Sequence, residues 1–274
     1  MQNPTCRSLL WDNRVEVLLF GKGTGDWRLQ GGSPDEVEKN NPGILSRLKD
    51  IFDEFPRVQF YAPRPLEFNA EIVHPHDLNE PWGDRFWRGK EADGVILQRP
   101  RQAFLIASAD CPTLIFRNYF TGMIITSHAG RDCLFDRQKL FTGTPSRKKE
   151  SVIQNLPNNL VPREMAAWIF CGIVGKYFSH PWDHLVNGED NKKISLHFGE
   201  DCLVGDPWEG RLELREVIKK QLIALGVPSW AINGDHVDTY SDREPNDRQQ
   251  YRWHSARRDG PGGGRNLVVV LRHK

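Results

Sequence analysis

Hydrophobic and polar residues follow two patterns along the chain, which together predict a mixture of strands and helices. Short apolar runs bounded by turn-forming residues are typical of strands. Such runs are found at Val15–Phe20, Arg57–Ala62, Leu66–Val73, Gly94–Leu97, Ala103–Ala107, Thr113–Phe116, Gly122–Ser127 and Asn266–Arg272. Apolar residues at helical spacing, flanked by capping residues, predict a short helix from Pro34, a second over Ile44–Phe55 and a third within Glu209–Leu225.

Three other segments are less distinctive. Residues 74–93 are polar, aromatic and turn-prone, which predicts a long surface loop that binds a ligand or forms a lid. Met165–Val174 fits a buried strand or a buried helix, because its apolar run has no clear period. We expect another strand to begin within Ser229–Asn233. Because no repeat or change in composition marks a boundary, residues 1–274 are expected to form a single mixed α/β domain.

The composition indicates a soluble protein. Charged residues make up 27% of the chain and the formal net charge is +1, so overall charge predicts neither a nucleic acid nor a membrane surface as a partner. No stretch approaches the roughly 20 apolar residues of a membrane span, and residues 1–12 do not resemble a secretory signal. The five cysteines include no Cys-x-x-Cys pair, which favours a reducing, cytoplasmic location over a disulfide framework.

The clearest chemical signal is a cysteine and a histidine at the outer ends of two predicted strands. Cys111 precedes the strand at Thr113–Phe116, and His128 follows the strand at Gly122–Ser127. The turn between these strands is centred near Tyr119, and a hairpin brings its two outer ends together. The spacing therefore predicts that the thiol and the imidazole can meet.

Three interpretations of this pair remain open on chemistry alone. Cys111 and His128 can be a buried structural pair. They can be a nucleophile and its base, since an imidazole that takes the thiol proton leaves a reactive thiolate. They can also be two ligands of a zinc ion, which then needs further donors. The neighbouring Asp110 either stabilises the turn before the strand or orients the imidazole and accepts a proton.

Several segments resemble one known family. "SADCPTLIF" and "GMIITSHAG" resemble the "TADC-P-hydrophobic" and "A-V-HAGWRG" motifs of the bacterial laccase-domain proteins of the YfiH type. "SPDEVEKNN", "EADGVIL" and "CGIVGKYF" are similar to further family segments in the same order, and "HSARRDGPGGGRNLVVVL" resembles the family's "FSYRRDGxxGRMxxxIxL". The resemblance runs along nearly the whole chain and identifies the protein as a divergent member.

The resemblance implies a fold and a metal. The family fold is α+β, a single-domain layered α/β sandwich with mixed β-sheets, similar to that of toxin deamidases with a Cys–His pair. A His–Cys–His set in the family binds one zinc ion, and its last two members correspond to Cys111 and His128. The first belongs to a "QVHG" motif that "IVHP" resembles, which implies His74 as the third ligand and His76 as a reserve. A fourth position would remain for water or phosphate, as in catalytic zinc sites.

The resemblance also implies an activity. The family, first called polyphenol oxidases, is described as zinc-containing purine nucleoside phosphorylases, which use inorganic phosphate to release the base from adenosine, inosine, guanosine or methylthioadenosine, with adenosine deamination as a related activity. Cys111, His128 and Asp110 are then the candidate catalytic residues. Arg131, Arg257 and Arg258 are candidates for binding phosphate or substrate, because a guanidinium matches phosphate oxygens.

The chain departs from the family around the metal. "HAGWRG" has become "HAGRDC", and "QVHG" has lost its Gln and Gly. Two alternatives therefore stand beside the phosphorylase: a metal-free hydrolase or deamidase with Cys111 as nucleophile and His128 as base, and a nucleoside-binding protein that has lost catalysis. A copper oxidase is disfavoured, because a blue-copper plus trinuclear site needs about ten His and Cys ligands.

Overall fold

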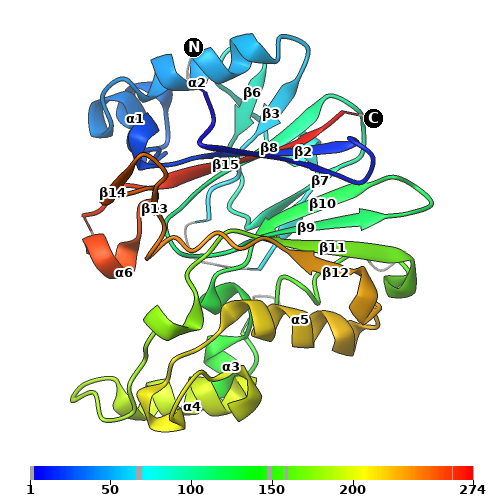
Figure 1. The fold of residues 1–274 in the computed structure, drawn as a ribbon. Coiled ribbons are helices and arrows are strands. Elements are labelled where there is room, and N and C mark those ends of the chain that lie inside the picture. The colour runs from blue at the N-terminus through cyan, green and yellow to red at the C-terminus, as the bar shows by residue number, and fades with distance from the viewer. Residues whose placement is uncertain (1–2, 66–69, 147–149, 158–159, 261, 274) are drawn as a thin grey trace.

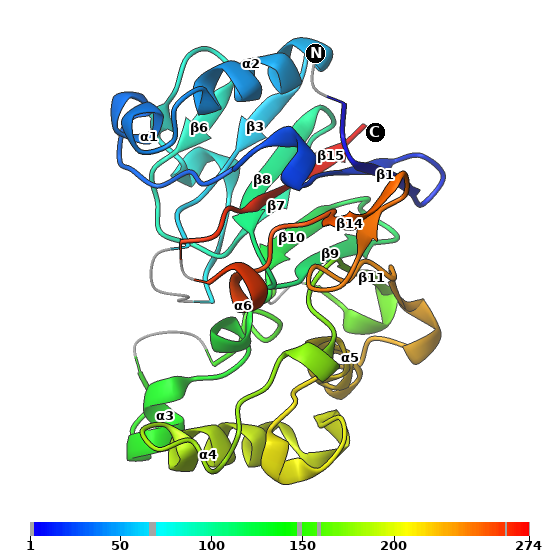
Figure 2. The same cartoon turned by 60° about the vertical axis from the view of Figure 1, so that its left-hand side comes forward.

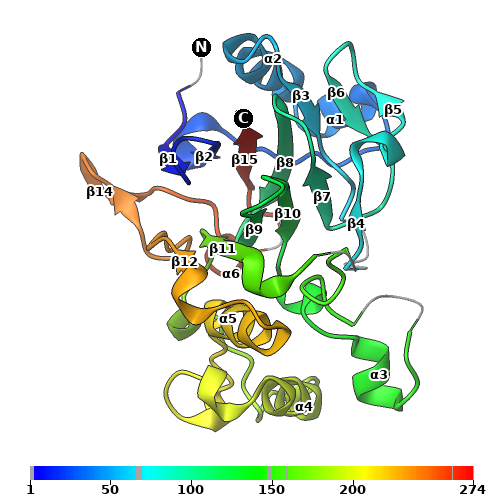
Figure 3. The same ribbon diagram turned by 90° about the vertical axis from the view of Figure 1, so that its right-hand side faces the viewer.

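Two β-sheets stacked face to face form the centre of the computed structural model, and helices cover both outer faces (Figure 1). The structure describes residues 3–65, 70–146, 150–157, 160–260 and 262–273. Helices α1 (Pro34–Asn40) and α2 (Ile44–Glu54) lie against the first sheet. Helix α5 (Leu214–Leu225) lies next to the second sheet, and α4 (Gly188–Phe198) lies farther from that sheet than α5 (Figures 1 and 3). This is the layered α+β sandwich with mixed sheets predicted from the sequence.

The first sheet has seven strands in the described part of the chain. In spatial order they are β1 (Cys6–Leu10), β2 (Val15–Phe20), β15 (Asn266–Arg272), β8 (Gln102–Ser108), β3 (Gln59–Tyr61), β6 (Phe86–Arg88) and β5 (Glu80–Pro81). The central strands β2, β15 and β8 pair antiparallel, whereas β3 pairs parallel with both β8 and β6. The sheet is therefore mixed.

The second sheet has six strands among the described residues. Their spatial order is β12 (Ile232–Gly234), β11 (Met165–Phe170), β9 (Thr113–Asn118), β10 (Ile124–His128), β7 (Gly94–Leu97) and β4 (Ile72–Val73). The central strands pair antiparallel, and the edge strands β12 and β4 pair parallel with their neighbours. A separate hairpin joins β13 (Arg243–Glu244) to β14 (Asp247–Tyr251).

Alternate residues of the long strands enter different cores. On β15, Val268 and Val270 face the core between the two sheets, whereas Leu267, Val269 and Leu271 face the core under α1 and α2. A third core lies between the second sheet and helices α4 and α5. Because both faces of each sheet are buried, the central strands read as continuous apolar runs rather than as an alternating pattern.

Most predicted strands and helices are confirmed, with small shifts at their ends. Val15–Phe20, Gly94–Leu97 and Asn266–Arg272 are strands with the predicted bounds, and α2 ends one residue before the predicted Phe55. The ambiguous Met165–Val174 contains strand β11. Of the strand expected at Leu66–Val73 only β4 is present, and residues 66–69 lie outside the described part.

Other elements differ from the predictions. The expected loop at residues 74–93 contains β5 and β6, which extend the first sheet. Five further features were not predicted from the sequence: β1, α4, the β13–β14 hairpin, α3 (Arg137–Thr142) and α6 (Ala256–Asp259). These are short or polar, so neither period is clear in them. No helix of the described residues is long and apolar enough to span a membrane.

Candidate functional site

The hairpin of β9 and β10 places the predicted cysteine and histidine side by side. His128 pairs with Thr113, two residues after Cys111. Gly130 packs against both side chains, because a Cβ atom on it would lie 2.6 Å from Sγ of Cys111 and 3.0 Å from Cε1 of His128. A glycine is therefore required there, which explains the "HAG" sequence.

His128 is buried between two cysteines and a carboxylate. Sγ of Cys133 lies 3.4 Å from Nδ1 of His128, and Oδ1 of Asp93 lies 3.6 Å from the same nitrogen. Burial acts to lower the pKa of His128, but the charges of Cys133 and Cys111 outweigh it. The carboxylate of Asp93 and a hydrogen bond with Cys111 act in the same direction, so the pKa of His128 is raised well above its usual value.

Asp93, His128 and Cys133 have the geometry of a metal-binding group. Their ligand atoms lie within 4.8 Å of one another, and all three side chains are buried. Ligands of a tetrahedral zinc ion lie about 3.3–3.6 Å apart, which the two distances to Nδ1 match. Oδ1 of Asp93 has no hydrogen-bond partner among the described residues, whereas Oδ2 accepts a hydrogen bond from the backbone of Ala70. Nitrogen, sulfur and carboxylate oxygen suit zinc.

The third ligand implied by the family resemblance lies elsewhere. The backbone N–H of His128 donates to the carbonyl of Asp93, just before β7, whereas His74 follows β4 at the level of the middle of β7. Strand β7 separates the two histidines, and strands lie about 4.8 Å apart. The ring of His74 stacks on the exposed His76 instead. Neither histidine joins a group with Cys111 and His128 in the described part of the chain.

A cavity of 190 Å³ opens beside Cys111, and neither Cys133 nor Asp93 is among its lining residues. Its lining residues are Cys111, Gly130, Arg131, Asp132, Phe178, His180 and Arg257. A second, polar cavity of 340 Å³ shares Arg131, His180 and Arg257 with the first. The two arginines and one histidine thus form a layer between two cavities.

The charges in this layer favour an anion. Nη2 of Arg257 lies 3.0 Å from Nε2 of His180, and Nη1 of Arg131 lies 3.4 Å from Nδ1. Burial, together with the charges of Arg131 and Arg257, lowers the pKa of His180 to about 3. The imidazole is therefore neutral at pH 7, and the guanidinium of Arg131 is also paired with Asp132. The positive charge faces the cavities.

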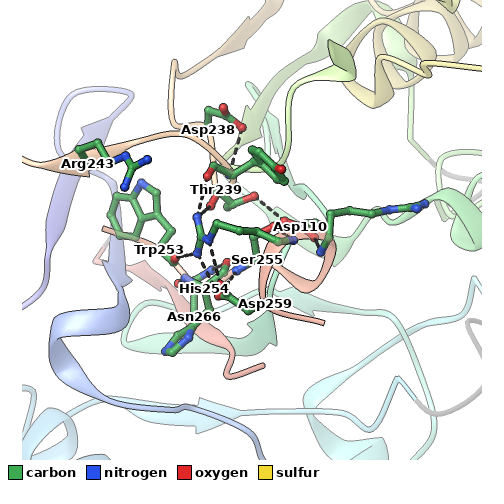
Figure 4. Close-up of polar contacts among 12 residues, drawn as sticks. Asp110, Asp238, Thr239, Arg243, Trp253, His254, Ser255, Asp259 and Asn266 are labelled. Atoms are coloured by element: carbon green, nitrogen blue, oxygen red, sulfur yellow. Dashed lines mark hydrogen bonds and ion pairs between the residues drawn. The ribbon is translucent and has the colours of Figure 1, made fainter. Parts of the chain in front are cut away.

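Asp110 holds two loops together next to Cys111. Its Oδ1 accepts a hydrogen bond of 2.8 Å from Oγ1 of Thr239, and its Oδ2 accepts one of 2.9 Å from the backbone of Arg257. Figure 4 shows Asp110 and Thr239 directed toward each other. Asp110 is buried, so it positions Arg257 at the cavity rather than facing substrate. Helix α6, which carries Arg257, thereby lies at the edge of the site (Figure 2).

Arg258 has a different position from its neighbour. Its five N–H groups donate to Asp259, to the carbonyls of Thr239 and Tyr240, and to the carbonyl of Trp253. Since a guanidinium has five donors, none is left for a ligand. The prediction that Arg258 binds phosphate is therefore replaced by a structural role, whereas Arg131 and Arg257 do line the cavity.

Three residues of the site were not found from the sequence. Asp93 ends the "EAD" segment, Cys133 ends the "HAGRDC" segment, and His180 lies in a loop far along the chain. The family resemblance covers the first two segments, and the altered "RDC" ending was the available signal for Cys133. Nothing in the local sequence of His180 indicates its contact with Arg257, because the contact is made by the fold alone.

Comparisons with known proteins agree with the fold and the motifs. The family model described as "Multi-copper polyphenol oxidoreductase laccase" matches residues 67–273. The chain belongs to this laccase family. No curated protein matches it in sequence. Family membership does not depend on the copper chemistry in that description. Among the described residues, this laccase-domain protein has one candidate metal-binding group, formed by Asp93, His128 and Cys133.

Solved structures share the laccase-domain fold along nearly the whole chain. The hypothetical protein YfiH of Bacillus licheniformis is 18% identical with a TM-score of 0.66, over 94% of this chain and 93% of that one. YlmD of Geobacillus stearothermophilus is 16% identical with a TM-score of 0.64, over 95% and 93%. A Neisseria meningitidis protein is 17% identical with a TM-score of 0.62, over 95% of both chains. At these identities the likeness shows the fold.

Proposed function

We propose that this protein is a zinc-dependent purine nucleoside phosphorylase. In this reaction, phosphate attacks C1′ of the ribose, the glycosidic bond breaks, and the purine leaves with a proton, giving the free base and ribose 1-phosphate. The observation that carries the proposal is the cavity beside Cys111, which two arginines and a neutral histidine line. A phosphate ion needs such donors. Among the described residues that line this cavity, the one carboxylate belongs to Asp132, the partner of Arg131.

Arg257 is the principal phosphate ligand in this proposal. Its backbone is fixed by Asp110, and its guanidinium lies over the ring of Phe178 and against His180. These contacts hold the positive charge in place before phosphate arrives, which removes an ordering cost from the transition state. Arg131 contributes a second guanidinium beside the same histidine, where phosphate competes with Asp132.

Zinc fits the buried group behind the cavity. Asp93, His128 and Cys133 would hold it, and it would supply positive charge beside the imidazole that contacts Cys111. The chain itself buries these ligands and excludes water from them. The five cysteines are all unpaired, which supports the expected cytoplasmic location. We assign a purine nucleoside as the substrate on the family resemblance.

The proposal is tested by the phosphate dependence of base release. Arg257→Gln is expected to raise KM for phosphate at least tenfold, with a smaller change in KM for the nucleoside. Arg137→Gln is the matched control, because Arg137 lines only the polar cavity and pairs with the exposed Asp190. Equal KM values for phosphate in the two variants would exclude the cavity beside Cys111 as the phosphate site.

A second candidate function rests on the alignment of Cys111, His128 and Asp93. Cys111 is partly exposed at the cavity, His128 lies next to it, and Oδ1 of Asp93 lies 3.6 Å from Nδ1 of the ring. This order is that of a nucleophile, its base and an orienting carboxylate. In a metal-free hydrolase, the Cys111 thiolate would attack an amide carbonyl, the amine would leave with a proton from His128, and water would release the acid.

Metal analysis and alkylation separate the two functions. One zinc ion per chain, with slow alkylation of Cys111 by iodoacetamide, supports the phosphorylase. Metal-free protein that is rapidly alkylated at Cys111, with Cys6 as the partly exposed reference thiol, supports the hydrolase.

A further inference from the structure

A larger cavity, of 620 Å³, lies where the carboxyl ends of β3 and β8 meet the loop before α1. Its partly exposed apolar lining includes Leu29, Pro65 and Ala107. Four arginines line it: Arg28, Arg64, Arg88 and Arg265. It shares no lining residue with the two cavities beside Cys111. The phosphorylase proposal leaves this concentration of positive charge without a role.

Arg88 is the most informative of the four, because it is buried and poorly paired. Its residue is 3% exposed, and among the described residues its guanidinium donates one hydrogen bond, from Nη1 to the carbonyl of Leu29. Within the part of the chain that the structure describes, its buried Nε has no hydrogen-bond partner and its guanidinium forms no ion pair with a carboxylate. The guanidinium lies over the ring of Trp82. By contrast, Arg258 uses all five donors.

Burying a charge without a counter-ion is costly, so such a group indicates an absent partner. The nearby acids are already engaged: Glu80 pairs with Arg64, and Asp26 pairs with Arg28. The backbone N–H of Arg265 donates to Oδ1 of Asp26, but its guanidinium donates to the carbonyls of Gly263 and Gly264 and forms no ion pair among the described residues. Arg88 and Arg265 are thus two guanidinium groups that line one cavity and have no ion-pair partner among the described residues.

We propose that this cavity binds a small phosphate ester. The phosphate lies between Arg88 and Arg265, where guanidinium donors remain for its oxygens, and an uncharged ring lies on Leu29, Pro65 and Ala107. The volume of the cavity favours a phosphate ester over the free phosphate ion, since 620 Å³ is within the range of cavities that hold whole organic ligands. The apolar lining gives the body of such a ligand a matching surface. The inference does not depend on the phosphorylase activity.

The test uses adenosine 5′-monophosphate as the probe, with adenosine and inorganic phosphate as matched partial ligands, measured by calorimetry on the full chain. The nucleotide is expected to bind more tightly than either part, and more weakly as salt is added. Arg88→Met, which keeps an unbranched apolar stem and removes the guanidinium donors, is expected to raise the dissociation constant at least tenfold. Arg137→Gln is the control and leaves nucleotide binding unchanged, because Arg137 does not line this cavity.

Two further measurements keep the proposal open to refutation. If Arg88→Met does not fold, as judged by thermal unfolding, Arg265→Gln decides, with an expected rise of at least threefold. The proposal is overturned if the wild-type protein does not bind the nucleotide at 1 mM, or if folded Arg88→Met binds it as the wild type does. Equal affinity for adenosine and the nucleotide also overturns it. Phosphorolysis by Arg88→Met reports on the other site and is expected to persist.

Discussion

Sγ of Cys133 lies 3.4 Å from Nδ1 of His128, so the cysteine that ends the "HAGRDC" segment faces the histidine that begins it. The 3₁₀ turn at Arg131–Cys133 folds the chain back and creates this contact. Together with Asp93 the pair forms a buried group of three donors. The departure from the family's "HAGWRG" therefore places a thiol in this group, at the position of the final glycine and two residues after the lost tryptophan.

Replacing Cys133 tests the metal group. Cys133→Ala is expected to lower bound zinc from one ion per chain to below about one fifth, since two donors hold zinc poorly. Metal content of freshly purified protein, measured by mass spectrometry, checks this. Cys202→Ala is the matched control, because Cys202 is equally buried in the same core and lies outside the group.

His74 gives the opposite expectation. The structure leaves it outside the group around His128, so His74→Ala should retain zinc at the wild-type level. If His74→Ala loses zinc while Cys133→Ala keeps it, then the ligand set implied by the family resemblance is right and the group described here is not a zinc site.

The two neighbouring arginines should respond differently to the same change. Arg258→Lys replaces a side chain with five filled donors, so we expect it to lower the free energy of unfolding by about 3 kcal/mol. Arg257→Lys, at the cavity, should change stability by less than about 1 kcal/mol but raise KM for phosphate. Urea unfolding and steady-state kinetics measure the two effects, and an equal loss of stability would contradict the assignment.

Asp110 is expected to act through position rather than by proton transfer. In Asp110→Asn one carboxylate oxygen becomes an amide N–H₂ group, which cannot accept a hydrogen bond. The side chain can then no longer accept hydrogen bonds from both Thr239 and the backbone of Arg257. Stability should fall by about 1–3 kcal/mol, with KM for phosphate raised and the pH profile of kcat unchanged. Thr239→Val removes one of the two bonds and should show about half the loss. A shifted pH profile would indicate direct catalysis instead.

His180 predicts a pH dependence of stability. Its pKa is about 3 in the folded protein, because of burial and of Arg131 and Arg257, against an ordinary value of 6.5. Between these values the unfolded chain binds more protons, so acidification below about pH 6.5 destabilises the fold and higher pH does not. His180→Gln cannot take up a proton. The loss of unfolding free energy from pH 7 to pH 5 should therefore be smaller in the variant by about 2 kcal/mol. Equal losses in both proteins would contradict the buried, neutral imidazole.

The sequence predicted the parts of the structure that local patterns determine. The apolar runs that became β2, β7 and β15 are unambiguous because both faces of each strand are buried. The symmetric placement of Cys111 and His128 about a turn was enough to predict their meeting, since a hairpin fixes which residues pair. The layered sandwich followed from the family resemblance.

The remaining parts depend on contacts between distant segments. His74 was chosen by its motif, but the register of β4 on β7 carries it away from His128. Arg257 and Arg258 are adjacent and chemically alike, and only the fold turns one toward a cavity and the other toward carbonyl groups. His180 reaches Arg257 across 77 positions of sequence. No local period or motif encodes such contacts.

The most direct measurement of the proposed function follows inosine and phosphate by ³¹P NMR with protein of known zinc content. Phosphorolysis predicts that the signal of inorganic phosphate is replaced by that of ribose 1-phosphate, in equal amount to the hypoxanthine released, and that no base forms without phosphate. Release of hypoxanthine with free ribose at the same rate in the absence of phosphate, or no release by zinc-loaded protein from any purine nucleoside, would contradict it.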